Sequence, residues 1–400
     1  MKNYWDFYLT ERIVFGNGSI MRLDAVLKRL KAQNLLLITD QGITKSGLTT
    51  KVAGLLQDWG YQLIVYDQAV PEPPVEKAVE CYEFAKAQMK IDAIIGLGGG
   101  SSIDLAKIVA LLLAQGGHPR DYFGENAIDH PIAPLIAIPT TAGTGSEVTS
   151  VAVVTDTENN IKVGISNNYL RPSVALLDPE LTLELPPYVS ACSGIDALSH
   201  AIEAYMAKDF KYIQAEGEIL FQGSNPISDT FALQAIELLY HNLVTAVQQG
   251  TNLEARSNML LGSLFAGIAF SNAGTALAHA LAYPIGGAAK SPHGEITGLL
   301  LPYVMMFNAE VQGKKMSLIA EAFHLNCSQL ESRQQSLLVA DKVLELLKSI
   351  GLPTKLSSIG VKNESLPGIA EKALQIDRLI RNNPRVPTKE GLIALLEDAY

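Results

Sequence analysis

The chain has 400 residues, of which 48% are hydrophobic and 18% charged, the balance of an ordinary folded protein long enough for two domains. Acidic residues outnumber basic ones by 41 to 31, and the net charge of −10 without a basic cluster argues against a nucleic-acid-binding surface. The apolar runs fall short of the roughly 20 residues that span a bilayer. The chain does not open on a signal-peptide pattern, and its three cysteines lie far apart. We therefore expect a cytoplasmic protein that binds neither membranes nor nucleic acid and has no disulfide framework.

The first half of the chain alternates short apolar runs with segments of helical periodicity. The apolar runs predict buried strands at 35–38, 63–66, 93–97 and 135–138, and the periodicity predicts helices near 47–59, 75–88 and 102–114. The first three strands begin about 30 residues apart, which is the period of βαβ units and predicts a mostly parallel sheet covered by helices. Residues 151–155 and 161–165 predict a hairpin, and 174–177 predict a further strand.

The second half differs in character, because helical periodicity near 229–249, 254–272, 315–324 and 332–350 is not interrupted by a convincing strand. We place a domain boundary near residue 185. Residues 1–185 are expected to form an α/β domain with a Rossmann-like parallel sheet, and residues 186–400 an all-α domain.

A glycine-rich loop, Gly96–Ser102, follows one of the predicted strands and begins a predicted helix. Glycines allow a backbone to approach a phosphate closely, and a helix N-terminus offers free N–H groups and a positive dipole end. The loop matches neither the Gly-x-Gly-x-x-Gly fingerprint nor a P-loop, so a tight turn without a ligand is the alternative. A second loop, 139–147, carries hydroxyls and glycines at the end of another strand, where open α/β sheets bind ligands. A turn rich in Ser and Thr accounts for that pattern equally well.

Asp40 ends the strand predicted at 35–38. A carboxylate at this place can accept hydrogen bonds from the hydroxyls of an adenosine ribose and repel a 2′-phosphate, which favours NAD over NADP. It can equally cap the turn that follows, and the sequence leaves both roles open.

Three of the seven histidines are placed as metal ligands. Asp196 and His200 lie four residues apart, about one helical turn, so that both project from one helix face. His279 stands in an almost wholly apolar run, where an imidazole needs a partner, and His293 stands in a segment expected to be a loop. One carboxylate and three imidazoles form a donor set for a divalent transition metal, although a helical Asp/His pair alone is more often solvated or hydrogen-bonded. The remaining histidines are expected to be surface or core residues: His118, His130, His241 and His324.

Taken together, four blocks resemble the iron-containing (group III) alcohol dehydrogenase family over nearly the whole chain. They are 98–107 (GGGSSIDLAK), 138–147 (IPTTAGTGSE), 194–205 (GIDALSHAIEAY) and 279–294, which closes on Pro-His-Gly. The resemblance implies a dinucleotide-binding α/β domain and a helical metal-binding domain, with metal and nicotinamide meeting in the cleft. It also implies a homodimer or a larger homo-oligomer.

The resemblance further implies roles for individual residues. Those that match the metal ligands, and would act in catalysis through the metal, are Asp196, His200, His279 and His293. The metal is expected to be Fe²⁺, with Zn²⁺ as the alternative because it binds more tightly to most such sites. The expected cofactor is NAD, and the matching residues are Asp40, Gly98, Gly99, Gly100, Ser101, Thr140, Thr141, Thr144, Ser146, Lys162 and Leu181.

The activity that the resemblance implies is reversible hydride transfer between NAD(H) and a small primary alcohol or aldehyde. Two other functions are kept as alternatives: a lyase of the dehydroquinate-synthase type, and a non-catalytic NAD-binding protein of the same fold. The lyase would need several basic residues around the cleft to hold a phosphorylated, carboxylated substrate, and the four blocks supply few.

Three features depart from the family pattern. Tyr283 stands four residues after His279, where many relatives carry a second histidine, and a tyrosine hydroxyl is a poor base near pH 7. Glu72 stands where asparagine is frequent. Residues 209–224 (DFKYIQAEGEILFQGS) are expected to form a loop insertion that stays exposed to solvent. Its part 218–224 resembles a picornaviral 3C-type protease site, so an engineered insert and a natural surface loop both remain open.

Overall fold

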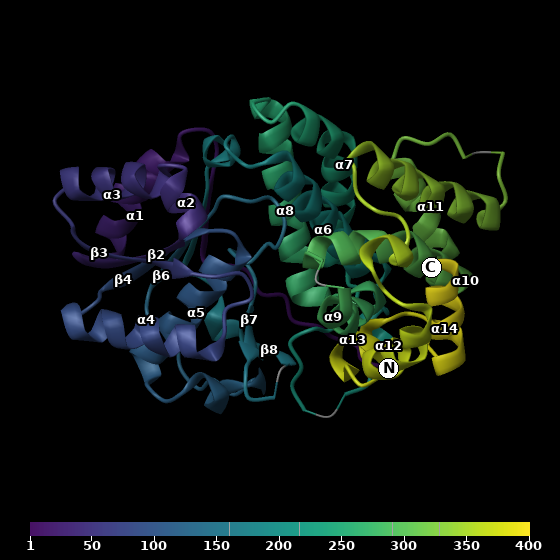
Figure 1. Cartoon of the computed structure of the whole chain (residues 1–400), viewed down its shortest axis with the longest axis horizontal. Coiled ribbons are helices and arrows are strands. Elements are labelled where there is room, and N and C mark those ends of the chain that lie inside the picture. Colours follow the sequence, from purple (N-terminus) through teal and green to yellow (C-terminus); the bar gives the residue numbers. More distant parts are fainter. Residues whose placement is uncertain (160, 216, 290, 328) are drawn as a thin grey trace. The chain divides into compact units, whose positions relative to one another are not determined.

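The structure is a computed structural model that describes residues 1–159, 161–215, 217–289, 291–327 and 329–400. It divides into two compact units, an α/β unit and a helical unit (Figure 1). The α/β unit consists of Tyr8–Glu184 and Glu218–Leu220. The helical unit consists of Met1–Phe7, Leu185–Gly217 and Phe221–Tyr400.

The α/β unit is built on a six-stranded sheet in which all neighbouring strands run parallel. The strand order is β1 (Arg12–Phe15), β9 (Val174–Leu177), β6 (Leu135–Pro139), β4 (Ala93–Gly98), β2 (Asn34–Asp40) and β3 (Gln62–Ala69). The expected parallel sheet is therefore confirmed. The sequence did not predict β1, because this edge strand has only four residues and none of them is fully buried.

Helices cover both faces of this sheet, since alternate residues of a strand point to opposite sides. Leu36 of β2 packs in one apolar cluster with side chains of α4 (Val75–Gln88) and α5 (Gly100–Gln115). Leu37, its neighbour, packs in another cluster with side chains of α1 (Leu23–Leu30) and α3 (Leu48–Asp58). Figure 1 shows the two pairs of helices on opposite sides of the sheet. The short helix α2 (Gln41–Lys45) follows β2 directly.

A second, three-stranded sheet contains the predicted hairpin. β7 (Val151–Asp156) pairs antiparallel with β8 (Ile161–Ser166), and β5 (Gly124–Glu125) joins β8 in parallel. The hairpin is confirmed, while Asn160 in its turn lies outside the described residues.

The helical unit contains the helices α6 (Pro187–Met206), α7 (Pro226–Gln248), α8 (Leu253–Ala273), α9 (Leu277–Ala289), α10 (His293–Ala322), α11 (Ser332–Ser349), α12 (Leu366–Leu374), α13 (Asp377–Asn382) and α14 (Lys389–Asp398). The helix expected at 315–324 is only the last part of α10, which bends at Gln312. The loop expected around His293 is wrong, because His293 is the first residue of α10 and Pro292 is its N-cap. No single helix in the described part of the chain is long and apolar enough to cross a bilayer. Within the described residues, α8 and α9 taken together meet that criterion by length and composition, with a bend of 100° between them.

The segment 209–224 is exposed to solvent only in its first part, whereas we expected an exposed loop throughout. Phe221 is 1% exposed, and the guanidinium of Arg378 lies 4.9 Å from the centroid of its ring. The backbone N–H groups of Gln222 and Gly223 donate to the carbonyl oxygens at the end of α8, Asn272 (2.8 Å) and Ala273 (3.1 Å). The end of the segment thus packs against the connection between α8 and α9, while Glu216 lies outside the described residues.

Candidate metal centre

Helix α6 supplies the first two predicted ligands, Asp196 and His200, one turn apart on one buried face. His200 is sandwiched between two rings with nearly parallel planes. Its ring centroid lies 4.3 Å from that of Phe270 on α8 and 4.6 Å from that of His279 on α9. Packing on both sides of the imidazole fixes its orientation, which a ligand to a metal requires.

The third ligand, His293, reaches the site because α10 crosses α6 at very short range. A Cβ atom on Gly294 would lie 2.2 Å from the carbonyl oxygen of Cys192 and 2.9 Å from Cβ of Asp196. Only glycine therefore allows this crossing. The hydroxyl of Thr297, one turn further along α10, donates to Oδ1 of Asp196 at 2.7 Å. The ring of Tyr283 lies 6.0 Å from that of His293.

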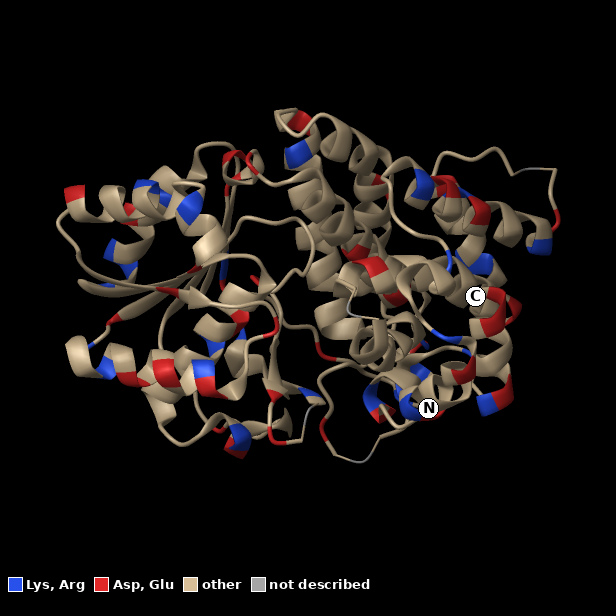
Figure 2. Ribbon diagram, viewed as in Figure 1, with Lys and Arg blue, Asp and Glu red and all other residues tan. Residues whose placement is uncertain are grey.

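The fourth ligand, His279, lies on α9, which contains no charged residue and is uniformly tan in Figure 2. Its charged partner comes from α6 instead. The Nδ1 atom of His279 lies 2.6 Å from Oε2 of Glu203, a carboxylate that is only 3% exposed. Glu203 also accepts the backbone N–H groups of Ala276 (2.9 Å) and Ala278 (2.5 Å) at the start of α9. A hydrogen bond at Nδ1 leaves Nε2 of His279 to act as the ligand atom.

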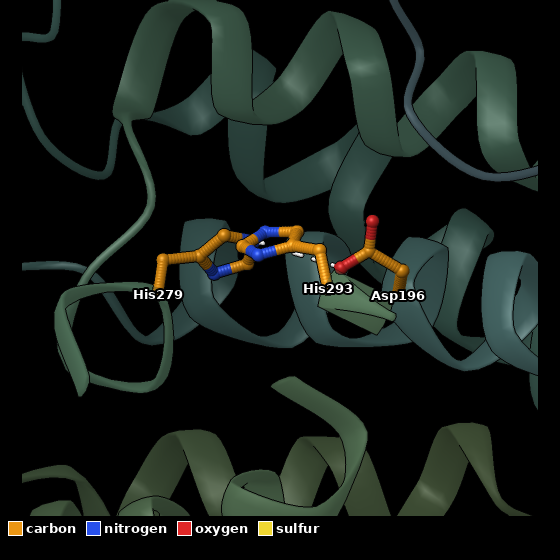
Figure 3. A group of neighbouring side chains, drawn as sticks. All are labelled: Asp196, His279 and His293. Carbon is orange, nitrogen blue, oxygen red and sulfur yellow. Dashed lines mark ion pairs between the residues drawn. The ribbon is translucent and has the colours of Figure 1, made fainter. Parts of the chain in front are cut away.

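Three of the four predicted ligands thus come together in the helical unit, and the fourth, His200, stacks on the ring of His279. The ligand atoms of Asp196, His279 and His293 all lie within 4.8 Å of one another, and Figure 3 shows the three side chains converging. Nε2 of His279 lies 3.8 Å from Oδ1 of Asp196. Among the described residues it is buried without a hydrogen-bond partner. Such an orphaned nitrogen facing a carboxylate is what a divalent cation would satisfy, so the residues fit the expected metal.

The electrostatics of the site agree with this fit. Burial by itself raises the pKa of Asp196, but His200, His293 and His279 and the hydroxyl of Thr297 favour its charged form, so that its pKa lies below the ordinary value. The carboxylate is therefore ready to bind a cation at neutral pH.

Sequence reasoning missed Glu203, Thr297 and Phe270, which hold the ligands in place. For Glu203 a signal was present, because it follows His200 by three residues and Asp196 by seven on the same face of α6. Its link to His279 crosses 76 residues of sequence and carries no local signal.

The glycine loop and the second polar loop lie together in the α/β unit. Gly98 has a φ of +146°, and a Cβ atom on it would lie 2.7 Å from the Ser102 hydroxyl. A Cβ atom on Gly100 would lie 2.7 Å from Thr144 of the second loop. Within the described residues no side chain caps the N-terminus of α5, so its first N–H groups are left for a ligand. Ser146 donates its hydroxyl to Asp104 of α5 at 2.5 Å.

Three other predicted cofactor residues have contacts of different kinds within the α/β unit. Asp40 caps α2, accepting the N–H groups of Gly42 (2.8 Å) and Ile43 (3.1 Å), and its second oxygen accepts the Ser102 hydroxyl at 3.1 Å. Its role as a cap is confirmed, and ribose binding stays a prediction. Lys162 forms an ion pair with Glu72, and Leu181 packs in the apolar core beside the sheet.

Comparison with known proteins gives full-length matches. The profile described as iron-containing alcohol dehydrogenase matches residues 10–179, and the profile described as the C-terminal part of the Fe-containing alcohol dehydrogenase family matches residues 190–400. The NAD-dependent methanol dehydrogenase of Bacillus methanolicus is 34% identical over 394 residues, which are 98% of this chain and 99% of the relative. Long-chain-alcohol dehydrogenase 1 of Geobacillus thermodenitrificans is 37% identical over 399 residues, 97% of this chain and 96% of the relative. The crystal structure of a 1,3-propanediol oxidoreductase has a TM-score of 0.93 at 32% identity and covers 100% of both chains.

Proposed function

Because this chain belongs to the iron-containing alcohol dehydrogenase family, we propose that it transfers a hydride reversibly between NAD(H) and a small primary alcohol or aldehyde. The observation that carries the proposal is the convergence of Asp196, His279 and His293 around the orphaned Nε2 of His279, with His200 stacked beside them.

The metal would be held by Asp196, His200, His279 and His293, and we propose Fe²⁺, with Zn²⁺ as the alternative. A divalent cation at these residues supplies Lewis-acid chemistry, which lowers the pKa of an alcohol hydroxyl. The chain's own part is to hold the donor atoms rigidly. Glu203 fixes the tautomer of His279, and Thr297 holds the carboxylate of Asp196. Donors positioned in this way need no reorganisation when the substrate arrives.

For the cofactor, we propose that the pyrophosphate of NAD lies against the first turn of α5, because no described side chain caps this helix and its first N–H groups can bind a phosphate. Bound NAD supplies the hydride acceptor. Asp40 stands beside Ser102 at the end of β2, where its carboxylate would repel a 2′-phosphate.

The substrate is the least constrained part of the proposal. The relatives compared above are named for methanol, long-chain alcohols and 1,3-propanediol, which share an alcohol hydroxyl and differ in length. We propose small primary alcohols and aldehydes as the substrate class. The proton that the alcohol loses would go to solvent or through the ribose hydroxyls of the bound cofactor, because a tyrosine stands at position 283, where many relatives carry a second histidine. We further propose that the enzyme is cytoplasmic and forms a homodimer or a larger homo-oligomer. Light scattering measures the number of subunits directly.

The proposal is tested by replacing a ligand. His293→Ala should abolish metal retention and the appearance of NADH absorbance with ethanol, 1-propanol, 1,2-propanediol and 1,3-propanediol. The matched control is His241→Ala on α7, since Nε2 of His241 lies 3.1 Å from the carbonyl oxygen of Ala322, and this variant should keep both properties. Full activity in metal-free His293→Ala protein would refute the proposal. Metal analysis after anaerobic purification distinguishes iron from zinc.

A further inference from the structure

Glu72 adopts an unusual backbone conformation next to the glycine loop. Its φ is +52°, in the left-handed region, and the next residue is Pro73. This conformation is unfavourable for a residue with a β-carbon, and asparagine tolerates it better than glutamate. The surroundings hold it in place, because its N–H donates to the Ser101 hydroxyl (3.3 Å) and its carbonyl oxygen accepts the Thr155 hydroxyl (3.0 Å). A strained residue fixed beside a binding loop is a candidate for function.

The side chain of Glu72 forms an ion pair with Lys162. Lys162 stands on β8 directly opposite Thr155 of β7, so the hairpin binds Glu72 through two neighbouring residues. The Lys162 and Glu72 side chains are 23% and 53% exposed, respectively. Glu72 therefore connects the first turn of α5 to the hairpin. Its carboxylate also pairs with the ammonium group of Lys162, the cation that the hairpin carries at this place.

The charge balance at this place is unfavourable to an anion. Ser101 is the second residue of α5, whose N-terminal N–H groups are the proposed phosphate site. Ser101 contacts Glu72 and the adjacent Ser102 contacts Asp40, so two successive residues of the first turn each contact an acidic residue. Lys162 would attract a phosphate, but its charge is compensated by Glu72.

We propose that Glu72 is a specificity-determining residue. By neutralising Lys162 beside the glycine loop, it weakens the binding of dinucleotides, and the weakening increases with the negative charge of the ligand. This discriminates against the additional phosphate of NADP. The inference rests on the proposed function, because it assumes that the loop binds a dinucleotide.

The experiment measures equilibrium binding of NAD⁺, ADP-ribose and NADP⁺ to the full-length protein by titration calorimetry, at low and at high salt, without an alcohol. The variants are Glu72→Gln, Glu72→Asn, Lys162→Met and the double variant Glu72→Gln/Lys162→Met. The matched control is Glu80→Gln on α4. Glu80 pairs with Lys77, and the exposures of 26% for Lys77 and 52% for Glu80 nearly equal those of Lys162 and Glu72.

Glu72→Gln should bind ADP-ribose about two- to fivefold more tightly than the unmodified protein. The gain should be smallest for NAD⁺ and largest for NADP⁺, and should fall at high salt. It should disappear in the Lys162→Met background, and Glu80→Gln should show no gain. Glu72→Asn should show the same gain without loss of thermal stability, whereas a purely structural role of the ion pair predicts lower stability and unchanged affinity.

Unchanged or weaker binding in Glu72→Gln, while the unmodified protein binds all three ligands, would overturn this inference and leave the proposed function intact. A gain that persists without Lys162 would overturn it as well. If the unmodified protein binds neither NAD⁺ nor ADP-ribose, the proposed function fails together with the inference.

Discussion

Replacing Glu203 by glutamine tests whether this carboxylate controls the metal site. The side chain is 3% exposed and receives three N–H groups, from Nδ1 of His279 (2.6 Å) and from the backbone of Ala276 (2.9 Å) and Ala278 (2.5 Å). Glutamine has one acceptor oxygen and an NH₂ group that cannot accept. At least one of the three donors therefore loses its partner in the variant.

The expected size of the effect follows from which donor is lost. If Nδ1 of His279 loses its acceptor, the ring tautomer is no longer fixed and metal affinity should fall about 10- to 100-fold, or roughly 1.4–2.8 kcal/mol. If a backbone N–H is left unpaired instead, the folded state should lose about 1–3 kcal/mol. Glu203→Ala leaves all three donors without an acceptor and should lower both quantities further.

Metal affinity is read from the metal retained after dialysis against increasing chelator, and stability from melting curves with and without metal. The control is Ser199→Ala, which alters a fully buried hydroxyl of α6 that bonds to Ile195 within the same helix. This control should retain its metal. If Glu203→Gln retains metal as strongly as the unmodified protein, Glu203 does not set the orientation of His279.

Three further predictions concern packing, pH and proteolysis. Gly294→Ala should reduce metal retention more than tenfold and lower the free energy of unfolding by about 1–3 kcal/mol, because the new methyl group would lie 2.2 Å from the Cys192 carbonyl oxygen. Metal content measures the first effect and melting curves the second. Burial raises the pKa of Glu147 to about 7 from an ordinary value of 4.5, so its contribution to stability is fully present below about pH 4.5 and is lost as pH rises through about 7. Glu147→Gln should raise the free energy of unfolding by about 3 kcal/mol near pH 8 and change it little near pH 4.5. Urea titrations that show equal changes at both pH values would contradict this. The folded protein should resist cleavage by 3C-type protease between Gln222 and Gly223, because the N–H groups of both residues are hydrogen-bonded to the end of α8. Cleavage at this bond should occur only in denaturant, and gel electrophoresis measures it.

The strands of the parallel sheet were predictable because they are continuous apolar runs, which only burial on both faces explains. Leu35–Ile38 and Ala93–Leu97 are of this kind, and every residue in both runs is buried. The helix α9 was not predicted, because Pro284 in its middle interrupts the usual pattern. The start of α10 was missed for a related reason, since Pro292 and Gly294 are typical of a loop.

Three residues of the candidate metal site stood out in the sequence against their surroundings. Asp196 and His200 share a helix face, and His279 is an isolated imidazole in an apolar helix. The contacts that the supporting residues make with the ligands could not be predicted. Glu203 belongs to a helix that is buried almost throughout, where a further polar residue gives no indication of its partner.

By itself the sequence determined the fold class and the family, because strand runs, helical spacing and motif blocks are properties of neighbouring residues. Only the tertiary structure decided that Glu203 bonds to His279, that Glu72 neutralises Lys162 and that Phe221 is buried. The first two contacts join residues 76 and 90 positions apart. Such contacts depend on how α6 meets α9 and on where the hairpin returns to the glycine loop, and helix packing and sheet topology set both.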